Sequence, residues 1–353
     1  MTPGGADTKS PQKKPVQLKL SVLAVVSMLA GGGIAFAAGF ERGSMSAGLI
    51  SLFVVIAAIA ARRPATFKAG IASGVVAALA LLLAHVTGST PLLAGISMAV
   101  VALLTGVAVA GGPMAGVIGG VIGTAYFIPA ALSLTVKFSI ERTTELGLIG
   151  IFAGLLVVLA VVISQKIRRI EHSPRKKRAA ADPDQPGPLT LIGTALRHPS
   201  PERNYGIRRA LLLGAGLTLY LATDNHNFLW ILLTIFMVLK PDMEKTWTMA
   251  IARSKGNIAG ALAVGTLAQF VSGEVVAGIG LVLLVVCIGF YRRNYAVYAA
   301  GVSFLVVALM GDQSGSFISW AGMRAADAVI GGLIAIAAVY FILPEEEGAP
   351  TPT

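Results

Sequence analysis

Cationic and amide side chains next to apolar segments are the residues of this sequence that could do chemistry. Arg253, Lys255 and Asn257 lie within five positions, where a polar turn gives way to an apolar run. A guanidinium binds a carboxylate through two parallel hydrogen bonds, so Arg253 predicts contact with an organic anion, with a role in membrane topology as the alternative. We place Arg253 and Lys255 at the wet cytoplasmic mouth of the span, where snorkelling of its long side chain alone can explain Lys255. Asn257, one turn further in, would face a neighbouring helix or a polar passage.

A second candidate pair is Arg324 and Asp327, near the start of the last apolar run. Residues three apart share a helix face and can form an ion pair. Ionisable groups inside a membrane are expensive, which makes them candidates for function. Two interpretations stay open: a structural ion pair that clamps the last helix, and a role in coupling or in the substrate pathway.

No set of side chains in the sequence has the arrangement of an enzyme active site. The four histidines lie at predicted loops or span ends without the spacing of metal ligands. Cys287 has no base in its sequence surroundings, and no glycine-rich stretch has the context of a phosphate-binding loop. We therefore predict no catalytic residue, no metal and no cofactor.

The element that must position Arg253 is a predicted membrane hairpin over residues 228–260. Its first apolar run ends at Lys240–Pro241, because proline cannot continue a helix interior. Asp242 is placed to cap the next helix. Gly256 and Gly260 are four residues apart, so both lie on one face and predict the close approach of another backbone.

Composition places the whole chain in a membrane. Hydrophobic residues make up 55% and charged residues 13%, against about 25% charged residues in a soluble domain. The single cysteine excludes an intramolecular disulfide. The net charge of +11 does not indicate nucleic-acid binding, because the basic residues fall at the ends of apolar runs without an aromatic-interleaved basic face. The fold class is an all-α polytopic membrane protein.

We predict about twelve transmembrane helices from stretches close to the roughly 20 residues that cross the hydrocarbon. They are 20–40, 46–61, 67–87, 91–111, 114–134, 146–165, 209–223, 227–239, 254–272, 275–290, 295–311 and 323–343. Almost nothing separates the runs on either side of Gly112. The first run has an alternative as a signal peptide, since Ala35-Phe36-Ala37 resembles a cleavage site. An uncleaved span is favoured because the run is longer than a signal core.

Basic residues orient these spans. With the N-terminus inside, 24 of the 28 Lys and Arg residues fall on inner segments. The excess of Lys and Arg on one side marks the cytoplasmic face of a membrane protein. We therefore predict that both termini are cytoplasmic.

The predicted organisation has five parts. They are a disordered basic N-terminal tail (1–18), a first six-span half (19–166), a basic, Pro-rich cytoplasmic linker (167–207), a second six-span half (208–343) and an acidic C-terminal tail (344–353). The basic cluster of the linker either fixes topology or docks to anionic lipid. Residues 189–196 are predicted to form a short surface helix.

The two six-span halves resemble a parallel repeat. Gly70 and Gly74, which follow Lys68, have the four-residue spacing of Gly256 and Gly260, which follow Arg253. The Leu-Ile-Gly sequence at 148–150 follows Arg142 and Glu145, much as the Val-Ile-Gly sequence at 329–331 follows Arg324 and Asp327. Equal numbers of spans would put the repeat axis along the membrane normal. The first half lacks the tryptophan and the Arg-x-x-Gly sequence of the second, so we interpret it as a degenerate copy.

Several residues of the second half have the order and spacing of a known signature: Trp230, Thr234, Pro241, Thr246, Arg253, Gly256 and Gly260. They resemble the fusaric acid resistance (FUSC) superfamily, which includes aromatic acid exporters, although Asn257 replaces the threonine of its Arg-x-x-Gly-Thr motif. The resemblance extends to Arg208-Arg209, Arg293-Asn294-Tyr295 and Arg324-x-x-Asp327. It covers residues 195–343.

The resemblance implies proton-linked export of aromatic or other organic acid anions through the bacterial inner (plasma) membrane. The implied partners are a small organic anion, protons and membrane lipids. The substrate pathway would contain Arg253, Asn257, Trp230, Thr234, Arg324 and Asp327. The structural motif would contain Pro241, Thr246, Gly256, Gly260, Arg293, Asn294 and Tyr295. The Thr234 hydroxyl can equally bond back to its own helix. The alternatives are a passive anion channel, since plant malate channels resemble the same superfamily, and a membrane scaffold without transport.

Overall fold

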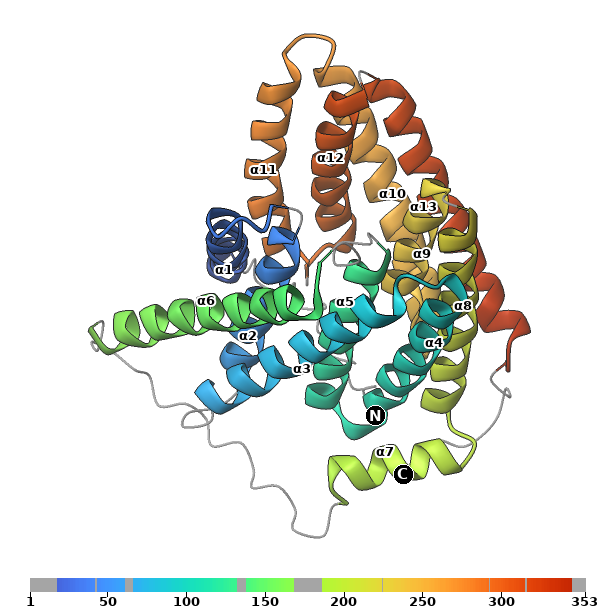
Figure 1. Cartoon of the computed structure of the whole chain (residues 1–353). Coiled ribbons are helices and arrows are strands. Elements are labelled where there is room, and N and C mark those ends of the chain that lie inside the picture. The colour runs from blue at the N-terminus through green and yellow to red at the C-terminus, as the bar shows by residue number, and fades with distance from the viewer. Residues whose placement is uncertain are drawn as a thin grey trace, which may run out of the picture. The chain divides into compact units, whose positions relative to one another are not determined.

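The computed structural model describes residues 18–41, 43–60, 66–131, 138–167, 186–223, 225–291, 293–314 and 316–344. Over these ranges the chain is helical and has no strand (Figure 1), which confirms the all-α class. The helices are α1 (Leu18–Ala37), α2 (Ser44–Ala60), α3 (Thr66–Thr87), α4 (Pro91–Val107), the 3-10 helix η1 (Ala108–Gly111), α5 (Pro113–Ala131), α6 (Ile140–Ile167), α7 (Pro188–Arg197), α8 (Pro201–Thr223), α9 (His226–Val238), α10 (Met243–Leu267), α11 (Gly273–Gly289), α12 (Tyr295–Ser314) and α13 (Phe317–Phe341).

Each predicted apolar run falls on a helix, and α7 covers the predicted surface helix. Within the described ranges, four helical segments are long and apolar enough to cross a membrane by length and composition: α3, α4 with η1, the first 24 residues of α6, and α13. Six shorter apolar helices accompany them: α1, α2, α5, α9, α11 and α12. These findings agree with a polytopic membrane protein, while the number of twelve spans stays a prediction. The predicted N-terminal tail (except residue 18), residues 168–185 of the linker and all but the first residue of the C-terminal tail lie outside the described residues.

Four helices, α6, α8, α10 and α13, begin six or more residues before the apolar runs that predicted them, and α8 and α10 show why. α8 starts at Pro201, where the Ser200 hydroxyl accepts a hydrogen bond of 3.1 Å from the Arg203 N–H. α10 starts at Met243, where Asp242 Oδ1 accepts 3.2 Å from the Lys245 N–H. These side chains satisfy donors that a helix start leaves open. The caps therefore set where the helices begin, and the apolar runs mark only their later parts.

The predicted boundary near Gly112 is a break in the helical backbone. Gly112 has φ +92°, a left-handed conformation that favours glycine. Pro113 follows as the first residue of α5, where its missing N–H costs nothing. The left-handed conformation of Gly112 therefore separates α4 and η1 from α5, although the hydropathy of the sequence hardly changes there.

The chain divides into two compact units. The larger unit comprises residues 23–251 and 326–353, and the smaller unit comprises residues 1–22 and 252–325. The division passes through the helices α1, α10 and α13. These units differ from the predicted six-span halves, which stay a prediction, and each unit is described separately below.

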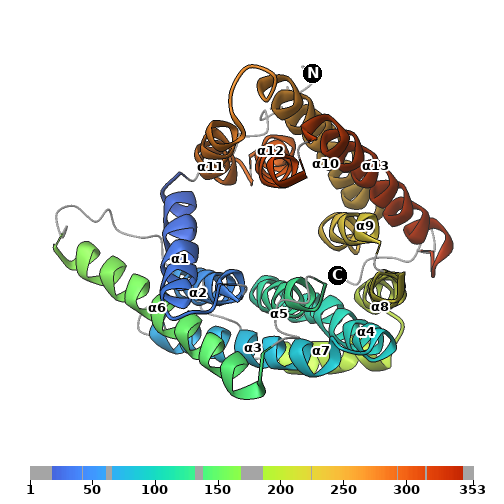
Figure 2. The same ribbon diagram turned by 45° about the horizontal axis from the view of Figure 1, so that its top comes forward.

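In the larger unit, α4 and α8 lie in close contact along their lengths (Figures 1 and 2). A Cβ added at Gly106 of α4 would lie 2.6 Å from the Gly206 Cα of α8. A Cβ at Gly214 of α8 would lie 2.8 Å from the Ala99 Cβ of α4. Small residues thus allow near-contact of the backbones, as in packed membrane helices. This contact joins a helix of the predicted first half to one of the second.

In the smaller unit, α11 and α12 pack side by side (Figure 1). Gly301 of α12 faces Cys287 of α11, and an added Cβ would lie 2.7 Å from its Sγ. Val264 of α10 joins Val276, Phe304 and neighbouring apolar residues in the core of this unit. The end of α10, α11 and α12 therefore form one packed group.

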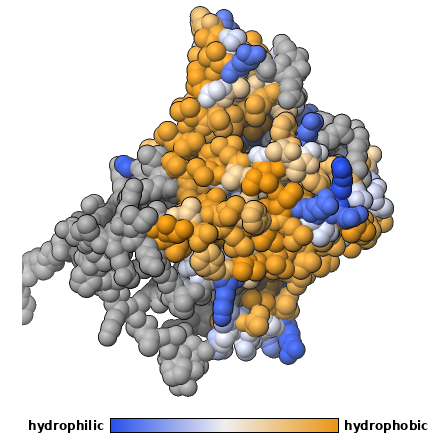
Figure 3. Space-filling model, turned by 60° about the vertical axis from the view of Figure 1, so that its left-hand side comes forward, coloured by the Kyte–Doolittle hydropathy of each residue, from blue (hydrophilic) through white to orange (hydrophobic). Residues whose placement is uncertain are grey.

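The outer surface carries many large apolar side chains. The face in Figure 3 is largely hydrophobic, with hydrophilic residues in small patches. Leu92, Leu262 and Phe270 are 63%, 66% and 77% exposed. Apolar surface of this extent in a water-soluble chain would mark a binding or membrane-contacting region. It suits helices that face lipid.

Candidate functional site

The turn between α9 and α10 is held by two polar side chains. The Thr246 hydroxyl donates to the carbonyls of Lys240 (3.2 Å) and Asp242 (3.0 Å) and accepts 2.9 Å from the Lys240 N–H. The Asp242 carboxylate pairs with the Lys245 ammonium at 2.9 Å. Hydrogen bonds from the Lys245 side chain and N–H lower the pKa of Asp242 below its usual value. The predicted cap at Asp242 is confirmed, and Thr246 fixes the turn at Pro241.

Arg208 of α8 connects this turn to the end of α13 in the larger unit. Its Nε donates 2.7 Å to the Ile342 carbonyl, and its Nη2 donates to the Leu343 carbonyl. A longer contact of 3.5 Å reaches the Pro241 carbonyl. The side chain is fully buried. A cation at the C-terminus of a helix satisfies carbonyls that would otherwise lack donors. Arg208 is therefore a structural residue.

The polar face of α10 lies in the smaller unit. Arg253 Nη1 donates 3.0 Å to the Tyr295 hydroxyl of α12. The Ser303 hydroxyl of α12 donates 3.2 Å to the Asn257 carbonyl. Arg253 is only 2% exposed, whereas we had placed it with Lys255 at a wet mouth. That expectation is wrong for Arg253, because Tyr295 gives its guanidinium an acceptor inside the helix pair. Lys255 is exposed, and its place at a cytoplasmic mouth stays a prediction.

Asn257 is the second polar residue of this face, one turn after Arg253. It is 1% exposed, and its Nδ2 has no hydrogen-bond partner among the described residues. A buried donor without an acceptor costs about 1–3 kcal/mol. The α10–α12 interface therefore holds a fixed guanidinium and an unused amide donor about 6 Å apart along the helix axis.

The predicted glycine pair brings α12 to this face. A Cβ at Gly256 would meet the Ala296 carbonyl oxygen, and a Cβ at Gly260 would meet the Ala300 carbonyl oxygen. Any side chain at either position would force the helices apart. The predicted close approach is confirmed, and its partner is α12.

The Arg293-Asn294-Tyr295 sequence starts α12. Asn294 Oδ1 accepts hydrogen bonds from the N–H groups of Ala296 (3.1 Å) and Val297 (3.4 Å). Arg293 is exposed. Tyr295 packs with Tyr291 and Tyr298, at ring centroid distances of 5.9 and 5.6 Å. Asn294 is thus a helix cap, and Tyr295, which we had assigned to structure alone, also contacts Arg253.

Trp230 and Thr234 lie on α9, in the larger unit. The Thr234 hydroxyl donates 3.0 Å to the Trp230 carbonyl, so the interpretation of a bond back to its own helix is confirmed. Thr234 also packs against α13, since a Cβ at Gly331 would lie 2.8 Å from the Thr234 Cβ. Within the described contacts, Thr234 serves helix packing.

Arg324 and Asp327 are both buried on α13, at 0% and 4% exposure. The helix begins at Phe317, six residues before the predicted span. Asp327 therefore lies about 15 Å along the helix, almost three turns in, rather than little more than one. Helical spacing places the two residues on one face, as predicted.

The structure brings together Arg253, Asn257 and Tyr295 among the predicted residues. Trp230, Thr234 and Asp327 belong to the other compact unit. Sequence reasoning missed Tyr298 and Ser303 of α12 and Tyr291 in the turn before it, whose signal was the recurrence of polar and aromatic residues from 291 to 303. It also assigned no role to Arg209, which contacts the rings of Tyr205 and Phe236.

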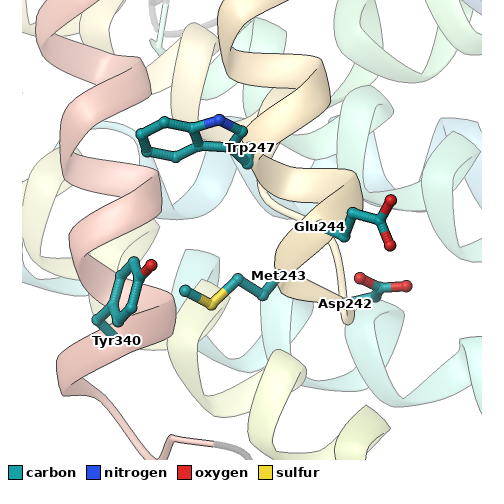
Figure 4. Close-up of a pocket in the computed structure, with 5 residues that line it drawn as sticks. All are labelled: Asp242, Met243, Glu244, Trp247 and Tyr340. Atoms are coloured by element: carbon teal, nitrogen blue, oxygen red, sulfur yellow. The ribbon is translucent and has the colours of Figure 1, made fainter.

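A surface hollow of ≈ 490 Å³ lies at the start of α10. Its lining residues are Asp242, Met243, Glu244, Trp247 and Tyr340. Figure 4 shows the Met243 side chain directed toward Tyr340, with both carboxylates pointing away from that ring. None of the predicted pathway residues lines it, and its carboxylates would repel an anion. This hollow is not the candidate anion site. No cluster of metal-ligating side chains occurs within the described ranges.

Comparison with known proteins gives two matches. Residues 213–338 match the family model described as fusaric acid resistance protein-like. The chain is also 29% identical over 193 residues to the inner membrane protein YccS of Escherichia coli (strain K12). This alignment covers 53% of the chain and 26% of that protein, so the chain spans about a quarter of the length of the curated relative it matches. No solved structure matches the chain.

Proposed function

Since the chain is a membrane protein that belongs to the fusaric acid resistance protein-like family, we propose that it exports organic acid anions with the uptake of protons. Aromatic acids are the first candidates. The membrane is the bacterial inner membrane, with both chain termini in the cytoplasm. The single observation that carries the proposal is the buried polar face of α10, where Arg253 and Asn257 meet α12.

Arg253 supplies the charge that an anion requires. Its hydrogen bond to Tyr295 orients the guanidinium at the α10–α12 interface. A guanidinium carries five N–H donors and can bind a carboxylate through two of them at once. Desolvation makes this attraction stronger than it would be in water. A carboxylate entering this interface would therefore be held by charge and by geometry.

Asn257 supplies a second contact to the same anion. Its amide nitrogen lacks a partner among the described residues and lies one turn from Arg253. An acceptor on the ligand would remove the cost of the unused donor. Binding would then satisfy a group that the empty protein leaves unsatisfied.

Asp327 is the candidate for proton coupling. It is buried on α13, on the same helix face as Arg324. A conformational change that alters the surroundings of the pair would let the carboxyl load and release a proton. Each charge that crosses gains about 2.3 kcal/mol per 100 mV, enough to drive about a 40-fold concentration of substrate.

We also propose that the two halves are parallel repeats. A Cβ at Gly150 of α6 would lie 2.7 Å from the Ala47 carbonyl oxygen and 2.7 Å from the Ile50 Cβ, both on α2. The corresponding Cβ at Gly331 of α13 would lie 2.8 Å from the Ile231 carbonyl oxygen, and its other neighbour is Thr234. In both halves, the glycine of the sixth span lies against a backbone carbonyl oxygen of the second span and against the side chain three residues later in that second span. This agreement supports the repeat.

The test begins with identification of the transported acid. Metabolites inside and outside cells that contain or lack the protein are compared, and the acid that changes is loaded into vesicles with the purified protein. An exporter concentrates the acid under a proton gradient, and a protonophore abolishes the concentration. Conductance that follows only the anion gradient would identify a passive channel instead. If the vesicles show neither concentration of the acid nor conductance, the scaffold interpretation is the one that remains.

A further inference from the structure

We infer that Arg209 of α8 is a second binding site, for an oxyanion group, within the larger unit. Its side chain is 5% exposed. The guanidinium carbon lies over the Phe236 ring at 4.8 Å from the centroid and over the Tyr205 ring at 5.4 Å. This site is independent of the function proposed above, since it involves neither Arg253 nor α12.

The neighbouring buried arginine shows what Arg209 lacks. Arg208 donates to the carbonyls of Ile342 and Leu343. Arg209 makes no ion pair or hydrogen bond with any residue in the described part of the chain, and its buried Nε has no acceptor there. Two aromatic rings flank its guanidinium instead.

Aromatic contacts do not satisfy a guanidinium. A ring over the guanidinium attracts the charge but accepts none of the five N–H groups, which lie in the guanidinium plane. A buried charged donor without an acceptor costs more than a neutral one. The buried Nε–H of Arg209 is therefore a donor in need of an acceptor atom. Two oxygens of one carboxylate or phosphate match the edge formed by this Nε–H and a neighbouring Nη–H.

The rings that flank Arg209 are themselves held in place. Phe236 stacks on Phe127 of α5, with centroids 5.3 Å apart and planes 7° apart. The Tyr205 hydroxyl donates 3.2 Å to the Leu239 carbonyl. Tyr205 precedes Arg209 by one helical turn, so both share a face of α8. The guanidinium is therefore preorganised before a ligand arrives, and the rings offer an apolar surface to the body of that ligand.

Two sources could supply the oxyanion: a free organic carboxylate and the phosphate of an anionic lipid. Arg209 lies near the cytoplasmic end of α8 in the predicted topology, so both can reach it. A third partner is an acidic segment of the chain itself. Glu345, Glu346 and Glu347 follow Leu343 in sequence and lie outside the described residues. The experiment must separate these three.

The experiment uses the full-length chain in phosphatidylcholine nanodiscs with 4-fluorobenzoate as the probe, observed by fluorine NMR. We expect Arg209→Gln to weaken probe binding at least about tenfold, as expected when one partner of a buried charge pair is removed. Arg197→Gln makes the same charge change at an exposed position of α7 and should leave binding unchanged. Repeating both measurements with Arg253→Ala present removes any contribution from the α10 site.

A second arm adds phosphatidylglycerol to the nanodiscs and measures the unfolding temperature. If lipid supplies the phosphate, this lipid should stabilise the wild-type chain and not the Arg209→Gln variant. Dependence on Arg209 in either arm supports the site and identifies its source. If Arg209→Gln changes neither measurement, the inference is wrong.

Two further controls keep the test decisive. The neutral probe 4-fluorobenzamide should not bind the wild-type chain, and equal binding of amide and carboxylate would overturn the oxyanion assignment even if Arg209→Gln failed to fold. Replacement of Glu345, Glu346 and Glu347 by Gln should leave probe and lipid effects unchanged. If Arg209-dependent binding arises only in this variant, the tail carboxylates are the partner, and the site is not a ligand site.

Discussion

The helices α10 and α3 share a pair of glycines four residues apart, yet the two pairs face different neighbours. Gly256 and Gly260 of α10 lie against backbone carbonyl oxygens of α12. On α3, a Cβ at Gly70 would lie 3.3 Å from the Val54 carbonyl oxygen, and a Cβ at Gly74 would meet the side chains of Val54 and Ile151. The contact on α10 is between backbones, whereas much of that on α3 is with side chains that can move.

The residues beside the glycines differ more. Alignment of Gly70 with Gly256 places Phe67 opposite Arg253 and Ile71 opposite Asn257. Phe67 and Ile71 are 37% and 45% exposed, while both polar residues of α10 are buried. One packing pattern thus carries an apolar surface in the first half and an enclosed polar face in the second. The difference teaches that glycine spacing specifies a helix contact but not a binding site.

The largest expected effect is that of Asp327→Asn on uphill transport. This change keeps the size of the side chain and removes its proton exchange, so concentration of substrate under a proton gradient should be lost. Glu145 of α6 occupies the nearby position in the predicted repeat and is exposed, so Glu145→Gln should retain transport. Vesicle uptake with and without a pH gradient measures both. An Asp327→Asn variant that still concentrates substrate would show that Asp327 is only a structural partner of Arg324.

Next in size is the effect of Arg253→Ala, which should lower the transport rate at least about tenfold through loss of a buried charge contact. Lys68→Ala, at an exposed position of α3, should change it less than twofold, within the small effects of surface substitutions. Initial rates in vesicles of equal protein content provide the measurement. Arg253→Lys, which keeps the charge, is the control for a loss of transport that arises from misfolding. Equal losses at the two positions would remove the functional distinction between the halves.

A smaller effect should separate Gly256→Ala from Gly70→Ala. The added methyl at Gly256 meets a backbone carbonyl and should destabilise the chain by about 1–3 kcal/mol. The methyl added at Gly70 would lie close to the Val54 carbonyl oxygen without overlapping it. Gly70→Ala should therefore lower the free energy of unfolding by less than about 1 kcal/mol. Thermal unfolding in detergent compares the two variants. A greater loss of stability at Gly70 would contradict the contrast between backbone and side-chain contacts.

The smallest perturbation tests the topology that the repeat requires. In a Cys287→Ala background, single cysteines at Ser173 and Ser314 should leave function unchanged. A membrane-impermeant thiol reagent should label the Ser314 position from outside intact cells and the Ser173 position only after permeabilisation. Labelling of both from outside would exclude cytoplasmic placement of the linker, and with it two halves of equal orientation.

The sequence was sufficient for features whose cause is local. The helix end before Pro241 and the Asp242 cap each follow from backbone chemistry within a few residues, and the structure confirms them. The burial of Arg253 was not predictable in this way, because its acceptor, Tyr295, is 42 residues away on a helix whose pairing with α10 is not encoded in hydropathy. The ring contacts of Arg209 escaped for the same reason, since Phe236 lies on another helix.

The contact of Arg208 with the end of α13 has a consequence for biosynthesis. The guanidinium on α8 is made and inserted long before its acceptors, the carbonyls of Ile342 and Leu343, leave the ribosome. Membrane insertion proceeds from the N-terminus, so α8 must wait for the last residues of the final helix before this buried cation gains those partners. A chain that stops short of Ile342 would retain the arginine without them, at a cost typical of a broken buried charge contact. Arg208 therefore makes the stability of an early helix depend on completion of the chain, so that prematurely terminated products would be recognisable to membrane proteases.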